Sequence, residues 1–134
     1  MSETVKLVKY HWQLEVYRLS VATSTDIFRA SKNFPREEIY SLTDQLRRAS
    51  RSVSASIAEA WRRRKYEAVF VNKLNEAEGE AAETQTWIEY AVHCEYLSKA
   101  QGRDLHRACD RILAMLTSMG NHPDRWLMKK TSRT

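Results

Sequence analysis

The sequence predicts an all-α protein, an up-and-down antiparallel four-helix bundle, on three observations. Its 134 residues include only three glycines and two prolines, too few chain breakers for the many turns of a sheet protein. Apolar residues make up 43% of the chain, which is enough to fill one hydrophobic core. Four stretches carry apolar residues every three or four positions, the period of an amphipathic helix. We therefore expect a single domain over residues 1–134, with a core at about 12–120 and a loose basic tail at 121–134.

The first two predicted helices span Trp12–Asn33 and Ser41–Arg64. Each has apolar residues at helical spacing along one broad face. Phe34-Pro35 ends the first helix, because proline disfavours the α conformation in the residue before it. Ser41 is expected to cap the second helix, with Asp44 three residues later completing a capping box.

The third predicted helix covers Tyr66–Leu97, and the fourth follows Gly102 and runs to Met119. The third carries an unbroken heptad-like row of apolar and small residues, which is typical of antiparallel bundles. The segment Gly120-Asn121-His122-Pro123 supplies the stop of the fourth helix.

The sequence contains no apolar run of the about 20 residues that a membrane span needs. The segment Met1–Tyr10 also lacks the long apolar stretch of a signal peptide. We therefore expect a cytoplasmic protein without a membrane partner. Cys94 and Cys109, the only cysteines, are then expected to be reduced thiols that fill space as small apolar residues.

The net charge of +5 conceals a strong segregation of charge along the chain. Residues 36–65 hold eight Lys or Arg against four Asp or Glu, whereas residues 66–97 hold one Lys against seven Glu. The predicted second helix is therefore basic and the predicted third helix acidic.

The cations of the predicted second helix share one side of a helical wheel, opposite the core stripe. One hypothesis is that they contact nucleic-acid phosphates, since guanidinium groups match phosphate oxygens and counterion release favours binding. The alternative is a solvated face that acidic neighbours partly neutralise. The residues predicted to bind nucleic acid are Arg47, Arg48, Arg51, Arg62, Arg63, Arg64 and Lys65.

The predicted third helix has a second face of small and amide-bearing residues where Lys and Glu would be usual on a solvent face. Such a face favours the close approach of another backbone at Gly79, and hence a homo-oligomer. The alternative is a tolerated surface glycine. The residues predicted to form this interface are Ala68, Asn72, Asn75, Gly79 and Ala82.

Motifs for metal binding and catalysis are missing from the sequence. It has neither paired Glu-x-x-His motifs nor His-Glu-x-x-His. One constellation straddles the predicted third and fourth helices, but adjacent helical residues point about 100° apart, so we expect no metal there. Its members are His93, Cys94, His106 and Cys109.

Catalytic and stacking sites are also not expected. The serines between Ser50 and Ser56 lack a glycine-rich elbow, and such small residues more often allow close helix packing. We expect the four tryptophans to be core, interface and tail anchors, because base-stacking platforms are usually clusters of exposed aromatic residues. The sequence therefore predicts no enzyme, no catalytic residue and no cofactor.

A set of motifs within these helices identifies a known family. The residues are Phe34-Pro35, Glu38, Tyr40, Leu42, Gln45-Leu46-Arg47-Arg48-Ala49, Val53 and Ile57-Ala58-Glu59. Together they resemble the four-helix-bundle proteins encoded in intervening sequences of bacterial large-subunit ribosomal RNA. The resemblance covers about Trp12 to Met119.

The resemblance implies a homo-oligomer, a barrel-shaped pentamer. It also implies a relation to the accessory proteins of diversity-generating retroelements, which bind nucleic acid and a reverse transcriptase. Arg47, Arg48 and Glu59 are signature positions of the family, without a catalytic role.

Two functional hypotheses follow from the residues and the resemblance. The first is an oligomeric protein that binds nucleic acid, RNA rather than DNA, through its basic helix face. The second is a protein-interaction scaffold, such as an accessory subunit of a reverse transcriptase, whose arginines form subunit contacts.

Overall fold

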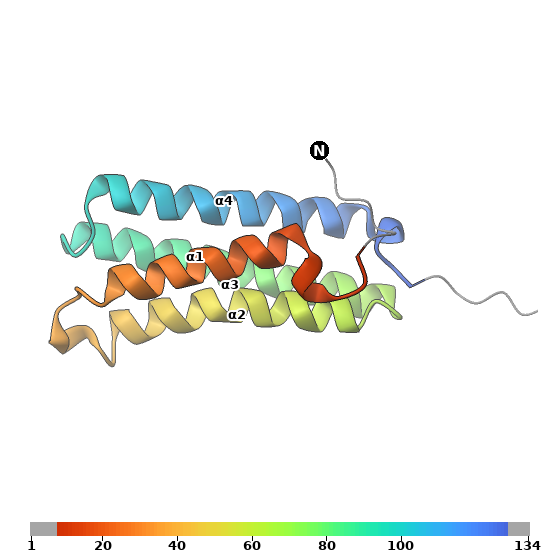
Figure 1. The fold of residues 1–134 in the computed structure, drawn as a ribbon, viewed down its shortest axis with the longest axis horizontal. Helices are drawn as coiled ribbons and strands as arrows, with labels where there is room; N and C mark the ends of the chain where they lie inside the picture. The colour runs from red at the N-terminus through yellow and green to blue at the C-terminus, as the bar shows by residue number, and fades with distance from the viewer. Residues whose placement is uncertain (1–7, 129–134) are drawn as a thin grey trace, which may run out of the picture.

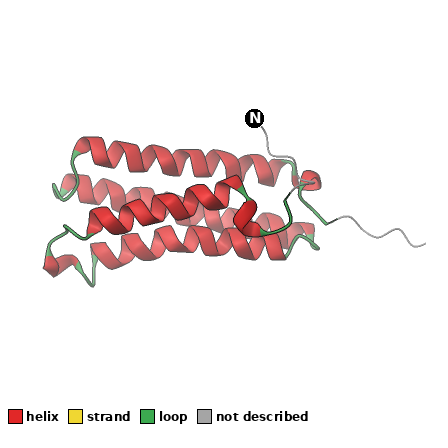
Figure 2. Ribbon diagram, in the orientation of Figure 1, coloured by secondary structure: helices red, strands yellow, loops and turns green. Residues whose placement is uncertain are grey.

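The computed structural model describes residues 8–128 and confirms an all-α bundle. Four long helices lie side by side, and the described residues contain no strand (Figures 1 and 2). Each helix packs against its neighbours in sequence, and α1 also packs against α4, which closes the bundle. The helices are α1 (Glu15–Ser31), α2 (Leu42–Arg62), α3 (Glu67–His93) and α4 (Lys99–Asn121), with short 3-10 turns η2 (His11–Gln13), η3 (Arg36–Glu38) and η4 (Pro123–Arg125).

The fourth helix begins earlier than the sequence predicted. Ser98 Oγ accepts a hydrogen bond from Gln101 N (3.0 Å), and Gln101 Oε1 accepts one from Ser98 N (2.9 Å). This reciprocal capping box starts α4 at Lys99 and places Gly102 inside its first turn. Gly102 is buried, and a Cβ there would overlap Val92 Cγ2. The glycine therefore allows close packing of α4 against α3 and does not mark a helix boundary.

The start of α2 also differs from the prediction. Ser41 occupies the position before the helix, but its side chain makes no capping hydrogen bond. Glu38 accepts a hydrogen bond from Leu42 N instead, at 3.4 Å, and its other carboxylate oxygen accepts one from Tyr96 Oη at 2.8 Å. The hydrogen bond to Glu38 raises the pKa of Tyr96 to about 12. Glu38 thus connects η3 both to α2 and to the turn between α3 and α4.

Two apolar clusters make up the core, one toward each end of the bundle. Phe70, Ile57 and Leu116 are central to the first cluster, and Ile27 and Ile88 to the second. A layer of small polar side chains separates the clusters, and it surrounds a gap of only about 10 Å³. The polar members of this layer are Ser20, Thr23, Ser50 and Thr84.

Hydroxyl groups join α1 to α2 in this part of the bundle. Ser20 Oγ lies 2.9 Å from Ser54 Oγ, and Ser24 Oγ lies 2.8 Å from Ser50 Oγ. Because short side chains bond across the contact, the two helices approach closely here. Ser50 and Ser54 of α2 thus serve helix packing, as predicted for the serines of this segment.

The chain stays packed beyond the predicted end of the core. Trp126 is only 9% exposed and lies edge-on to Trp61, with ring centroids 6.0 Å apart. The expectation of a loose tail after residue 120 is therefore wrong for residues 121–128, and residues 129–134 lie outside the described part. None of the helices in residues 8–128 has the length and apolar character needed to cross a membrane.

Candidate nucleic-acid interface

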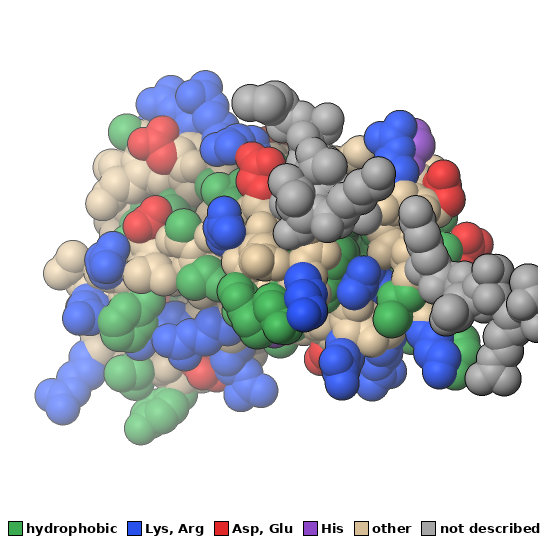
Figure 3. Space-filling model, turned by 45° about the vertical axis from the view of Figure 1, so that its right-hand side comes forward, with side chains coloured by type: hydrophobic (Ala, Val, Ile, Leu, Met, Phe, Trp, Pro, Cys, Tyr) green, Lys and Arg blue, Asp and Glu red, His purple; other side chains and the backbone are tan. Residues whose placement is uncertain are grey.

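The seven predicted cations fall into two groups on α2 and the turn that follows it. Arg47, Arg48 and Arg51 lie in the first half of the helix, and the rest lie at its C-terminal end or just beyond. At 1.5 Å rise per residue, about 22 Å of helix separates Arg47 from Arg62. Figure 3 shows Lys and Arg side chains along the lower edge of the molecule, over α2, interspersed with hydrophobic patches.

The first group is organised around an aromatic ring of α1. Arg47 Cζ lies 4.8 Å, Lys32 Nζ 4.9 Å and Arg51 Cζ 5.7 Å from the centroid of the Phe28 ring. These distances are within the range of cation–π contacts. We call these four residues the Phe28 cluster. Lys32 was not among the predicted cations, because it lies on α1's C-terminal side and only the fold brings it to α2.

Arg47 is held in place by a second contact. Its Nε donates a hydrogen bond to Ser31 Oγ at 2.8 Å, and that hydroxyl donates to the Phe28 carbonyl oxygen at 3.0 Å. Within residues 8–128, the terminal guanidinium nitrogens of Arg47 make no hydrogen bond. The ring and the hydroxyl therefore fix the guanidinium while leaving its outer donors available to a ligand.

Ion pairing distinguishes Arg48 from the Phe28 cluster. Arg48 contacts the carboxylate of Asp44 at 3.9 Å, one helical turn away, and both side chains are exposed. In the described part of the chain, no carboxylate forms a salt bridge with the three cations of the Phe28 cluster. Their positive charge is thus not neutralised by an ion pair within these residues.

A shallow groove between α1 and α2 continues from the Phe28 cluster. It has a volume of about 250 Å³ and is lined by Val21, Ser24, Thr25, Arg51 and Ser54. Four of these five residues carry polar side chains, and Arg51 gives the groove its charge. The cluster and the groove together form a continuous polar surface with positive charge at one end.

The second group contains one residue with a different environment. The guanidinium of Arg64 lies 3.6 Å from the Trp61 ring centroid and donates to the carbonyl oxygens of Trp61 (2.8 Å) and Trp126 (3.4 Å). Burial lowers the pKa of Arg64. Arg64 therefore connects α2 to the C-terminal segment, whereas Arg62, Arg63 and Lys65 are exposed. We call the cations of both groups other than Arg64, together with Lys32, the α1–α2 surface; Arg47 is half-buried and the others are exposed.

The small-residue face of α3 is open in the single chain. All five residues predicted to form an interface are exposed. A Cβ added to Gly79 would meet no atom within 4 Å. Contacts within the chain therefore do not require glycine at position 79.

An acidic stripe runs beside this face. Lys73 forms salt bridges with Glu59 of α2 (3.0 Å) and with Glu76 (2.9 Å). Partial burial and the nearby charges of Glu83 and Glu76 raise the pKa of Glu80. Along the stripe Glu76, Glu80 and Glu83, Lys73 thus neutralises Glu76, whereas Glu80 and Glu83 form no salt bridge within residues 8–128.

The four predicted His and Cys positions are spread over two environments. Cys109 is buried in the core, and burial raises its pKa to about 12. Cys94 and His93 are exposed, and His106 Nε2 lies 3.1 Å from Glu89 Oε2. Residues 8–128 contain no cluster of three or more His, Cys, Asp or Glu side chains suited to a metal ion.

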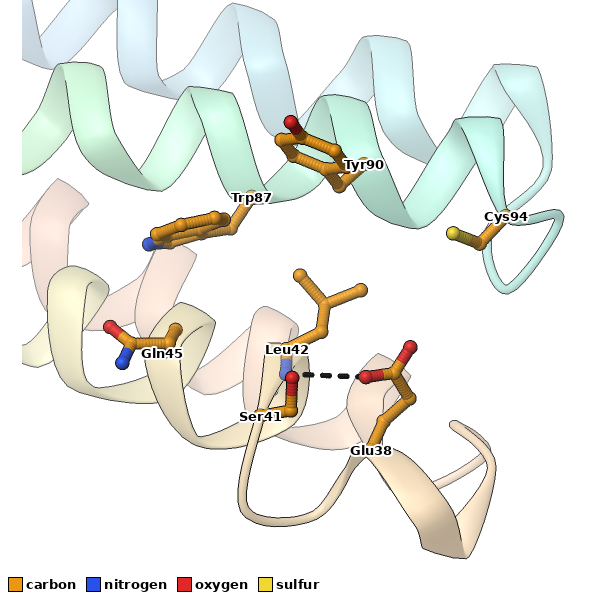
Figure 4. A pocket seen from close by; sticks show the side chains of 7 residues that line it. All are labelled: Glu38, Ser41, Leu42, Gln45, Trp87, Tyr90 and Cys94. Carbon is orange, nitrogen blue, oxygen red and sulfur yellow. Dashed lines mark hydrogen bonds between the residues drawn. The ribbon is translucent and has the colours of Figure 1, made fainter.

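A pocket of about 270 Å³ lies where the start of α2 meets the end of α3 (Figure 4). Trp87 and Tyr90 lie on its α3 side, with ring centroids 5.9 Å apart, and Cys94 lies at its edge. Its carboxylate, Glu38, already accepts hydrogen bonds from Leu42 N and Tyr96 Oη. The residues that line the pocket therefore offer no nucleophile with a hydrogen-bonded base beside it.

The exposed aromatic residues near the N-terminus were missed by sequence reasoning. Trp61 and Trp126 are buried anchors, as expected, but Trp12 is 53% exposed and stacks on Tyr10. The predicted first helix begins at Trp12, whereas in the structure Trp12 lies in the η2 turn and α1 begins at Glu15. No local sequence signal indicated this turn.

Comparisons with known proteins agree with the fold. A crystal structure of a protein of unknown function from the S23 ribosomal protein family, from Bacteroides thetaiotaomicron, is similar, with a TM-score of 0.72 and 29% sequence identity. The match covers 79% of this chain and 95% of that one. No curated protein matches the chain significantly. The sequence model of the 23S rRNA-intervening sequence protein family matches residues 12–118, and the chain therefore belongs to this family.

Proposed function

We propose that the protein is a non-enzymatic, oligomeric RNA-binding protein whose α1–α2 surface contacts RNA phosphates. The Phe28 cluster carries this proposal. Three cations, two from α2 and one from the end of α1, converge on one ring. None of the three forms a salt bridge with a carboxylate of residues 8–128. A surface that serves only solubility does not need its arginines held in place.

The physical basis is the phosphate chemistry of arginine. A guanidinium group presents planar, paired N–H donors that match two phosphate oxygens, and each neutralised phosphate releases counterions. Arg47 is already oriented by Ser31 and Phe28, so binding costs it little side-chain entropy. An oligomer repeats this surface in every subunit, and several modest contacts then act together.

RNA is favoured over DNA by the family context. The family is defined by proteins of 23S rRNA intervening sequences, so its members are encoded within an RNA-coding region. The cationic α1–α2 surface is compatible with either nucleic acid, and the choice of RNA rests on this context.

The oligomer in this proposal is a homopentamer assembled through the small-residue face of α3. Gly79 has open space above it in the single chain, so a neighbouring backbone can approach there. The number of subunits, five, is the one that the family resemblance implies. The assembly would place several α1–α2 surfaces on one particle.

One observation favours a second function, a protein-interaction scaffold such as an accessory subunit of a reverse transcriptase. Partial burial, and after it the charges of Glu83 and Glu76, raise the pKa of Glu80, so like charges repel one another along this stripe. Arginines of a neighbouring subunit would relieve that repulsion. In this alternative, Arg47 and Arg51 are buried in subunit contacts and unavailable to RNA.

The test is an anisotropy titration of a fluorescent single-stranded RNA with three proteins. These are the wild type, the triple variant Arg47→Gln, Arg51→Gln, Arg62→Gln, and a charge-matched control with Arg103→Gln, Arg107→Gln, Arg111→Gln on α4. We expect the α2 variant to bind at least tenfold more weakly and the control to bind almost as the wild type does. Light scattering on the same samples gives the oligomer mass.

Each other outcome has a definite meaning. If the α2 variant dissociates the oligomer, the arginines are subunit contacts and the scaffold function replaces RNA binding. If both triple variants lose affinity equally, net charge and not this surface determines binding. If the wild type does not bind RNA at low salt, the proposed function is wrong.

A further inference from the structure

Two aromatic rings form an exposed stack just before α1. The rings of Tyr10 and Trp12 are parallel within 3°, and their centroids lie 4.5 Å apart. The residues are 43% and 53% exposed. His11 contacts the Trp12 ring at 5.0 Å and the Tyr17 ring at 4.9 Å, both edge to face, and so connects the stack to α1. Burial in the core does not account for this stack, because both of its rings remain accessible to solvent.

Hydrogen bonds between side chains and backbone groups hold the stack in place before any ligand binds. Gln13 Oε1 accepts from Lys9 N at 2.8 Å and from Tyr10 N at 2.9 Å. Trp61 Nε1 donates to the Lys9 carbonyl oxygen at 3.1 Å, which ties this segment to the end of α2. The chain around the rings is thus fixed from both sides, and a ligand that adds to the stack does not have to order it first.

Cations flank the stack. Lys9 Nζ lies 5.4 Å from the Tyr10 ring centroid, and Arg18 Nε donates to the Trp12 carbonyl oxygen at 3.2 Å. Glu15 is the single acidic residue between positions 8 and 25. Because Trp61 holds the segment, the stack also lies at the end of α2 from which Arg62 extends. Exposed rings combined with cations are the arrangement with which proteins bind single-stranded nucleic acids.

We propose that the Tyr10–Trp12 stack binds an unpaired nucleobase of RNA, which adds to the two rings as a further layer. This inference rests on the proposed RNA binding and specifies the class of RNA, namely single strands. A base in a duplex has both faces covered by its neighbours, so it cannot stack on a protein ring without leaving the helix. The stack therefore supplies selectivity that the phosphate contacts lack.

The geometry allows the stack and the Phe28 cluster to bind one strand. Phe28 lies fourteen positions after Leu14, which is next to the stack, and this corresponds to about 21 Å along the helix. A single strand along α1 would place a base on Trp12 and phosphates near Arg51 and Arg47. The two sites then contribute to the affinity in different ways, since stacking is insensitive to salt concentration whereas phosphate contacts weaken as the salt concentration rises.

The experiment compares single-stranded and duplex RNA of the same sequence at one salt concentration. The variants are Trp12→Ala, Trp12→Phe and, as a control, Tyr40→Ala, which removes a 93% exposed aromatic residue at the other end of the bundle. Trp12→Ala should weaken single-strand binding by about 5- to 150-fold, the loss expected for one stacked base. Duplex binding should stay unchanged, and Trp12→Phe should retain most of the affinity because it keeps an aromatic ring.

Three results would overturn the inference, and they separate it from the proposed function. If Trp12→Ala binds the single strand as tightly as Tyr40→Ala does, no base stacks on Trp12. A loss of RNA affinity in the triple arginine variant would in that case still support phosphate binding. If Trp12→Ala lowers the oligomer mass, the stack is a contact with a second copy of the chain. If wild-type protein binds neither RNA, both proposals fail.

Discussion

Single residues at the α1–α2 contact have roles that sequence periodicity cannot distinguish. Arg47 and Arg64 are both arginines of the basic segment, yet Arg47 extends over Phe28 and Arg64 turns inward onto Trp61. Tertiary contacts contribute to the difference, because Arg47 reaches Phe28 of another helix and Arg64 also donates to Trp126, which is distant in sequence. A helical wheel shows the direction of a Cβ atom and does not show which ring or carbonyl the side chain reaches.

Tyr96 provides a pH-dependent test at the residue scale. Its hydrogen bond to Glu38 raises its pKa from 10 to about 12 in the folded protein. The neutral phenol is thus favoured by folding, and its contribution to stability is complete below pH 10 and is lost as the pH rises from 10 to 12. Absorbance titration at 295 nm should show one tyrosine ionising near pH 12. Glu38→Gln should shift that ionisation toward 10, and an unchanged titration would show that the bond is not formed.

The two cysteines should differ strongly in reactivity. Cys94 is exposed, whereas Cys109 is buried in the core with a pKa raised to about 12. Because the thiolate is the reactive form, a thiol reagent at pH 8 should label Cys94 quickly and Cys109 only after unfolding. Mass spectrometry of the labelled peptides measures this. Equal labelling of both cysteines in the native protein would contradict the placement of Cys109.

At the scale of helices, the sequence predicted which segments are helical and misjudged some of their ends. Apolar periodicity reports the buried face of a helix, and the cores of α1 to α4 follow it closely. Helix ends depend on single hydrogen bonds, such as Ser98 to Gln101, or on a residue from another element, such as Glu38 at Leu42 N. A local capping pair such as Ser98 and Gln101 can be recognised in the sequence, whereas a contact with a residue of another element can be known only from the fold.

Glycine substitutions test how α4 packs on α3. A Cβ at Gly102 would overlap Val92 Cγ2, whereas one at Gly120 would meet no atom within 4 Å. Gly102→Leu should therefore lower the free energy of unfolding by about 1–3 kcal/mol, the usual cost of overpacking. Gly120→Leu adds the same side chain in open space and should leave the free energy of unfolding almost unchanged. Urea denaturation measures both, and equal midpoints for the two variants would argue against the close α3–α4 contact.

At the scale of the whole molecule, the assembly can be tested separately from the fold. Gly79→Leu adds a side chain where the single chain has open space, so helical content should be preserved. If another backbone packs at Gly79 in a homopentamer, the variant should lose oligomer mass in light scattering. Ala114→Leu, at an exposed position of α4, is the matched control. An unchanged mass for Gly79→Leu would remove this face from the assembly.

The sequence predicted the bundle and the basic segment, but the composition of the α1–α2 surface required the fold. Phe28 lies on α1 and Lys32 directly after its last residue, and only helix packing places them beside Arg47. Trp12 joins the candidate site because a short turn precedes α1. Residues brought together from different helices leave no spacing pattern in the sequence, which is why this part could not be predicted.

The most direct test of RNA binding by the α1–α2 surface is the salt dependence of the affinity for single-stranded RNA. The log–log slope should be about −0.7 for each phosphate neutralised. In the variant Arg47→Gln, Arg51→Gln, Arg62→Gln, the magnitude of the slope should fall by about 2 if each arginine contacts one phosphate. The control variant on α4 should keep the wild-type slope. An α2 variant with an intact oligomer and the wild-type slope would contradict the account.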